Sequence, residues 1–115
     1  MAEALTVGGF ISNLEEKIAD QNDWQNWLKD FKRTTAGYAD FSSRAVTPES
    51  IASIAIGIYY VVVHLIDKKY HEKVDHQAEA ISCRAFLTKL FEEAQSANVD
   101  VKPTVVAFCL KQCGS

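Results

Sequence analysis

A run of sixteen residues from Ile51 to Ile66 (IASIAIGIYYVVVHLI) has no polar face, and this run constrains the fold more than any other feature. An ordinary surface helix keeps one polar side, whereas a segment that is apolar all round must be enclosed by protein or by lipid. As a helix the run would be about 24 Å long, short of the roughly 30 Å hydrocarbon core of a bilayer. We therefore expect a helix enclosed by protein, with membrane association through residues 51–66 as an alternative.

The residues on either side of the run mark the ends of a helix. Thr47 can cap the first free amides, Pro48 fits the first helical position, and Glu49 suits the positive end of the helix dipole. Polarity returns at residues 67–69, where lysines suit the negative end of the dipole. The pattern predicts a central apolar helix over residues 48–66.

Amphipathic patterns on both sides of the run predict four further helices. Their apolar residues recur at intervals of three and four, which places them on one helical face. These segments are residues 12–20, 24–36, 75–97 and 103–112. The polar stretch at residues 67–77 is the expected corner between the central helix and the next one.

Glycine and asparagine residues indicate where these helices begin and end. Gly8 and Gly9 disfavour a helix through residues 1–9, which we expect to be a loose lead-in. Gly37 and Asn98 suit left-handed turns after the helices that precede them.

Together these segments predict an all-α fold, a compact bundle of about five helices around the central apolar helix. A single turn between residues 38 and 46 is expected to place Phe41 on the core. A chain of 115 residues has the length of one domain, so we expect residues 1–115 to form a single helical domain.

Composition narrows the expected partners and compartment. The chain has 12 basic and 15 acidic residues, a formal net charge of -3 and no basic block, so nucleic acid is not an expected partner. Three cysteines, an odd number, fit reduced thiols better than a disulfide framework. The N-terminus has an acid, Glu3, where a secretory signal has bases. A cytoplasmic protein is therefore expected.

The clearest helical stripe consists of Trp24, Trp27, Leu28 and Phe31, at positions i, i+3, i+4 and i+7. Aromatic anchors at this spacing suit a protein core, and they also suit the groove of a partner. Core packing is the favoured interpretation of the single residues. Two tryptophans on one face nevertheless offer more apolar surface than a peripheral helix usually buries, so we expect this face to contribute to an interface.

Ser53 and Gly57 place two small residues four apart inside the apolar run. This spacing lets another backbone approach closely. In a water-soluble bundle the pair predicts close helix packing, and in a membrane it would mark a dimer face.

Two histidines are candidates for metal or haem ligation. A helix continuous from residue 47 to residue 75 would align His64, Asp67, His71 and Asp75 on one stripe. The simpler interpretation is favoured: His71 lies in a solvated turn, and His64 is a core histidine bonded to a carbonyl or a tyrosine. We expect no cofactor, with a metal or haem at His64 and His71 as the alternative.

No phosphate-binding loop, nucleophile elbow, HExxH or paired CxxC motif is present, so enzymatic activity is unsupported. We expect a small helical module for protein–protein interaction or self-association, with a protein partner or a homodimer formed through the aromatic face. The alternatives are a metal- or haem-binding protein and a membrane-associated protein.

Overall fold

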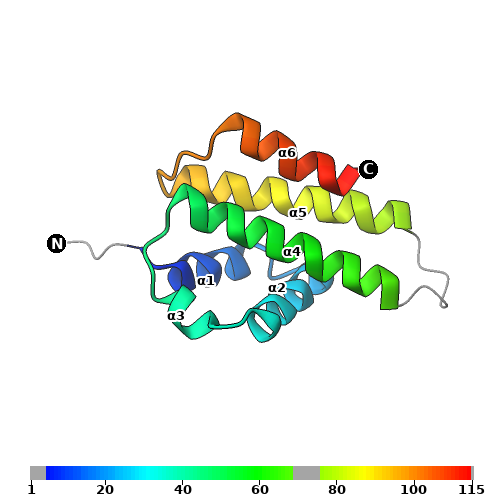
Figure 1. Cartoon of the computed structure of the whole chain (residues 1–115), viewed down its shortest axis with the longest axis horizontal. Helices are drawn as coiled ribbons and strands as arrows, with labels where there is room; N and C mark the ends of the chain where they lie inside the picture. The colour runs from blue at the N-terminus through cyan, green and yellow to red at the C-terminus, as the bar shows by residue number, and fades with distance from the viewer. Residues whose placement is uncertain (1–4, 69–75, 115) are drawn as a thin grey trace.

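The computed structural model describes the backbone of residues 5–68 and 76–114, and the side chains of residues 5–62 and 81–111. This part of the chain forms six helices and confirms the all-α fold (Figure 1). The helices are α1 (Val7–Lys17), α2 (Asn22–Thr34), α3 (Tyr38–Ser42), α4 (Pro48–Lys68), α5 (His76–Ser96) and α6 (Pro103–Gly114). The one helix beyond the five expected is the short α3, which corresponds to the single turn predicted between residues 38 and 46.

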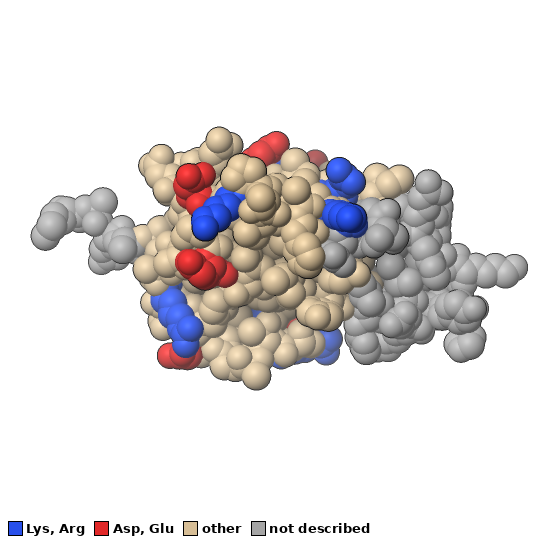
Figure 2. All heavy atoms as spheres, turned by 45° about the horizontal axis from the view of Figure 1, so that its top comes forward, with Lys and Arg blue, Asp and Glu red and all other residues tan. Residues whose placement is uncertain are grey.

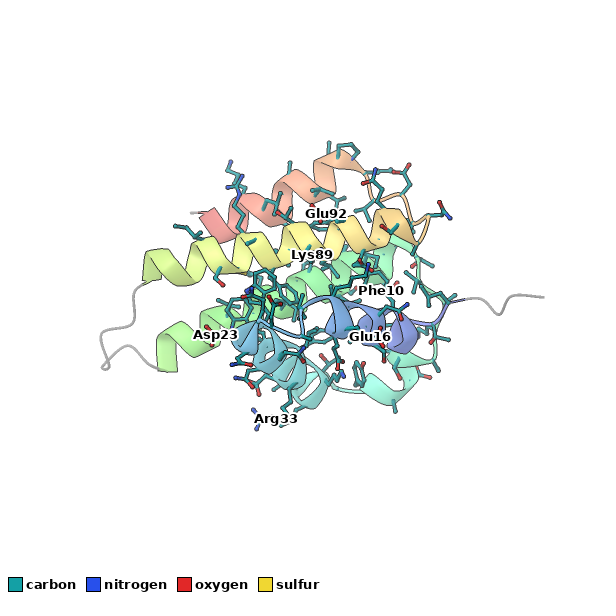
Figure 3. The ribbon with its side chains drawn as sticks, turned by 180° about the vertical axis from the view of Figure 1, so that it is seen from behind. Phe10, Glu16, Asp23, Arg33, Lys89 and Glu92 are labelled. Atoms are coloured by element: carbon teal, nitrogen blue, oxygen red, sulfur yellow. The ribbon has the colours of Figure 1, made fainter. Side chains whose placement is uncertain are left out.

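The three C-terminal helices, α4, α5 and α6, lie side by side. α5 runs back along α4, and α6 returns along α5 while also touching α4 (Figure 1). α2 packs against α4, and α1 contacts α3. Seen from behind, Phe10 lies between α1 and α5 (Figure 3), and it is almost fully buried. Buried apolar side chains from α1, α2, α4, α5 and α6 form one core cluster in the described part of the chain.

The predicted start of α1 is wrong, because the helix takes in both Gly8 and Gly9 in its first turn. The hydroxyl of Thr6 accepts a hydrogen bond from the Gly9 amide at 3.1 Å and so caps the helix. At Gly8 an added Cβ would lie 3.3 Å from the Ser42 carbonyl oxygen. The glycine therefore serves close packing of α1 against α3, which is a tertiary reason that local helix propensity does not reveal.

A short antiparallel bridge joins Thr6 to Ala45, so the segment before α1 pairs with the segment before α4. The Val7 amide donates to the Arg44 carbonyl at 2.9 Å, and the Val46 amide donates to the Leu5 carbonyl at 3.1 Å. These bonds hold the chain that leaves α3 against the start of α1.

Both predicted left-handed residues have positive φ angles, 71° at Gly37 and 61° at Asn98. After α5, the Val99 amide donates to the Ala94 carbonyl at 2.9 Å and the Asn98 amide donates to Gln95 at 3.0 Å. This pair of bonds satisfies the last carbonyls of the helix, as in a Schellman motif. Gly37 differs from the prediction because it immediately precedes α3 instead of ending α2.

The start of α4 carries the predicted cap at Thr47. The Ser50 amide donates to the Thr47 hydroxyl at 3.1 Å, and the Thr47 amide donates to the Ser50 hydroxyl at 2.8 Å. Serine thus takes the place that glutamate or glutamine holds in a capping box. Two free amides at the helix start are satisfied reciprocally.

One side of α4 is open, which corrects the expectation that the apolar run is enclosed all round. Ile54 and Ile58 are fully buried, whereas Ile56 is 43% exposed and Tyr60 is 67% exposed. α2, α5 and α6 pack against α4 and leave this strip between them uncovered.

We predict that Thr47→Ala lowers the free energy of unfolding by about 1 kcal/mol, because the Ser50 amide loses its acceptor at the start of α4. Urea denaturation followed by circular dichroism measures the change. Thr88→Ala is the matched control, since the Thr88 hydroxyl is exposed and bonds only to a carbonyl of its own helix. A loss at Thr47 no larger than that of the control would contradict the capping role.

Candidate functional site

A groove of about 540 Å³ lies between the C-terminal end of α2, α3 and the first half of α4. Its lining includes the rings of Phe31 and Phe41 at the base. Asp40 and Arg44 lie at the exposed rim, on or next to α3. We call this feature the α2–α3–α4 groove.

Three aromatic rings fix the wall formed by α3. Phe31 of α2 meets Tyr38 at a centroid distance of 6.1 Å and Phe41 at 6.5 Å, and Tyr38 meets Phe41 at 6.5 Å. All three pairs are edge-to-face or nearly so, which is the favoured arrangement of aromatic quadrupoles. Phe41 thus lies on the core as predicted, and the short helix is held against the end of α2.

The predicted close packing at Gly57 involves a side chain instead of a backbone. A Cβ added to Gly57 would lie 2.7 Å from Phe31 Cδ1 and closer still to Phe31 Cε1, so the glycine makes room for the ring. Ser53, the other small residue of the pair, is exposed and lines the groove. The two residues therefore have different roles: one admits Phe31 and the other widens the groove.

Ser53, Ile56, Gly57 and Tyr60 recur at intervals of three and four along α4 and so share one face, which we call the α4 stripe. The first three line the groove, and Tyr60 lies one turn beyond it. No charged residue occurs between residues 50 and 62. Ile56 and Tyr60 were not predicted as surface residues, although the same helical spacing that relates the aromatic residues of α2 connects them to Ser53 and Gly57.

The four residues predicted as an interface on α2 lie in the core or at its edge. Trp27, Leu28 and Phe31 are only 1–3% exposed, and Trp24 is partly buried. A partner could reach the first three only by displacing α2 from α4. They pack in the core of this structure, and only Phe31 also borders the groove, so their role as an interface stays a prediction.

Trp24 contacts α5 both through its indole N–H group and through its aromatic ring. The indole Nε1 donates a hydrogen bond to the Ser82 hydroxyl at 2.9 Å, and the ring meets Phe86 edge-to-face at 5.4 Å. A partly buried indole N–H requires such an acceptor. Two tryptophans on one helix thus bridge α2 to α5 across the core.

The two charged residues among the described lining of the groove neutralise each other. Arg44 Nη2 lies 3.0 Å from Asp40 Oδ2, one helical turn away. Such an exposed pair contributes little to stability. It does leave the rim of the groove without a net charge.

Tyr38 lies behind the groove beside an ion pair between Lys32 and Glu15. Burial raises the pKa of the Tyr38 phenol, Lys32 lowers it and Glu15 raises it again. The phenol is therefore neutral at physiological pH and adds no charge behind the groove.

A second groove, of about 520 Å³, lies between α5, α6 and the segment that connects them. Its lining includes Phe91 at the base and two acids, Glu92 and Asp100. In Figure 3 Glu92 lies between α5 and α6. The described lining holds no basic residue, but Glu92 Oε2 lies 3.9 Å from the ammonium group of Lys89, which is outside the lining.

The predicted metal ligands His64 and His71 lie outside the described side chains, as do Asp67 and Asp75. Within the described ranges, no cluster of three or more histidine, cysteine or acidic residues is arranged to hold a metal ion. None of the helices in the same ranges combines the length and the apolar character needed to cross a membrane.

We predict that Gly57→Ala lowers the free energy of unfolding by about 1–2 kcal/mol, although alanine alone favours a helix by up to about 1 kcal/mol. The new methyl group must displace the buried Phe31 ring. With Phe31→Leu, which removes the ring edge, the same change should become neutral or stabilising, a coupling of at least about 1 kcal/mol in a urea-denaturation cycle.

Ser53→Ala is the control for this cycle, since Ser53 is exposed and its variant should stay within about 0.5 kcal/mol of the parent. Additive effects of Gly57→Ala and Phe31→Leu would show that the ring does not limit the space at Gly57.

No family model, no curated protein and no solved structure matches this chain, so the roles of the groove and the α4 stripe are inferred from their own geometry.

Proposed function

We propose that this chain is a protein–protein interaction module that binds its partner through the α2–α3–α4 groove and the α4 stripe. The observation that carries the proposal is the exposure of Ile56 and Tyr60 on one helix beside a groove that is lined in part by aromatic rings. Adjacent apolar surface of this kind marks binding sites, whereas isolated exposed apolar residues are common everywhere.

The shape and chemistry of the surface suit the apolar face of a partner helix. A groove bordered by a helix accepts aliphatic or aromatic anchors spaced by one turn. Burying a side chain such as Ile56 would contribute about 1.5–3 kcal/mol before the costs of association. The neutral Asp40–Arg44 rim sets no requirement for the charge of the partner.

The charge distribution gives no support to a nucleic-acid partner. The formal net charge is -3, and Figure 2 shows basic and acidic side chains interspersed over the face in view. Nucleic-acid binding requires a cluster of basic residues that neutralises several phosphates. A reducing compartment such as the cytoplasm belongs to the same proposal, on the argument of three cysteines in one chain.

The proposal keeps the predicted class of function but moves the contact surface. The interface predicted from sequence is the aromatic face of α2, which packs in the core. In the present proposal the α4 stripe is the contact surface instead of the aromatic face of α2. Phe31 connects the two surfaces because it is both the last aromatic of α2 and part of the groove.

Selection of helical peptides from a phage-displayed library against the immobilised protein tests the proposal. We predict that selected peptides carry large apolar residues one turn apart and bind Ile56→Lys at least roughly tenfold more weakly than the parent chain. Thr88→Lys is the matched control, an exposed position on α5 that lines the other groove. Failure to select any peptide, or equal binding to Ile56→Lys and the parent, would overturn the proposal.

A further inference from the structure

We propose that the partner is a second copy of this chain: the two α4 helices cross in antiparallel orientation, and Tyr60 of each copy enters the α2–α3–α4 groove of the other. This inference rests on the proposed function, because it names the partner of the same surface. It follows from three properties of that surface: the placement of a knob and a groove, the order of large and small residues, and charge.

A protruding side chain and a groove that could receive it lie on the same face of α4. Tyr60 is largely exposed one turn beyond the groove, and Ser53 lines the groove. Their seven-residue separation corresponds to about 10.5 Å along the helix. In a twofold dimer each contact occurs twice, since residue i meets residue j and j meets i. A twofold dimer of this kind therefore requires that each copy carry both the protruding side chain and the groove on the same face.

The order of residue sizes on the α4 stripe selects the antiparallel orientation. With the twofold axis between Ile56 and Gly57, Tyr60 lies opposite Ser53 of the second copy, and Ile56 lies opposite its Gly57. The large Tyr60 then meets the small Ser53, as close packing requires, whereas the space at Gly57 is already filled by the Phe31 ring of its own copy. A parallel crossing in register would instead place Tyr60 against Tyr60 and Ile56 against Ile56.

The chemistry of the groove suits a tyrosine. A tyrosine has an apolar ring and a polar tip, and its hydroxyl needs a hydrogen-bond partner when it is buried. The groove offers the rings of Phe31 and Phe41 at its base and the polar side chains of Asp40 and Arg44 at its rim. The ring of Tyr60 would pack on the base while its hydroxyl stays at the rim.

Electrostatics allows two identical surfaces to meet here. The α4 stripe is uncharged, and Asp40 pairs with Arg44 within the same copy, so the contact sets no unpaired like charges against each other. Electrostatics therefore allows self-association through α4, because no like charges are brought together.

Sedimentation velocity over a range of protein concentrations tests the partner. The full chain is expected to dimerise, and Tyr60→Ala and Ile56→Lys should each raise the dissociation constant at least roughly tenfold. Thr88→Lys should leave it unchanged. A chain that stays monomeric at every concentration, or a dimer indifferent to Tyr60→Ala, would overturn the inference. Selected peptides that still bind a monomeric chain would show that the proposed function stands without it.

Disulfide cross-linking tests the orientation, with the joined peptides identified by mass spectrometry against the wild-type chain as background. Ile56→Cys lies beside the twofold axis and is expected to form a covalent dimer. Ser53→Cys is expected not to, because the two copies of residue 53 lie about 10 Å apart along the antiparallel helices, beyond the reach of a disulfide. Efficient cross-linking of Ser53→Cys would indicate a parallel crossing and overturn the antiparallel arrangement.

Discussion

The contact between the Phe31 ring and Gly57 is the constraint on which the shape of the α2–α3–α4 groove depends. It determines how closely α2 approaches α4, because any larger residue at position 57 would occupy the space of the ring. The same ring orients α3 through Tyr38 and Phe41. One glycine on α4 thereby sets the width of the groove.

The remaining helices allow α4 to expose apolar side chains. α5 and α6 cover one side of it and α2 covers another, so Ile51, Ile54 and Ile58 are buried without any contribution from the α4 stripe. Ile56 and Tyr60 are therefore surplus to the core, and their exposure costs free energy in an isolated chain. Retaining Ile56 and Tyr60 in place of polar residues is physically reasonable if another surface covers them.

Local chemistry made several features of the fold predictable from sequence. The Thr47 cap and the left-handed Asn98 depend on hydrogen bonds between near neighbours in the chain. The start of α1 was not predictable in this way, because Gly8 packs against Ser42, which is distant in sequence.

The candidate site was harder to predict for the same physical reason. Periodicity shows which residues share a face, but not which faces other helices cover. The face of Trp27 and Leu28 and the face of Ile56 and Tyr60 carry equivalent patterns in sequence. The first is core and the second is surface only because of where α2 and α5 pack.

The bridge between Thr6 and Ala45 couples the start of α1 to the segment that follows α3. It closes α1, α2 and α3 into a ring whose two ends meet at the start of α4. α3 is thus anchored on both sides, by the aromatic rings at its beginning and by paired backbone at its end. Loosening Leu5 or Thr6 would therefore release a wall of the groove that neither residue lines, so a local change at the start of α1 would alter the shape of a distant surface.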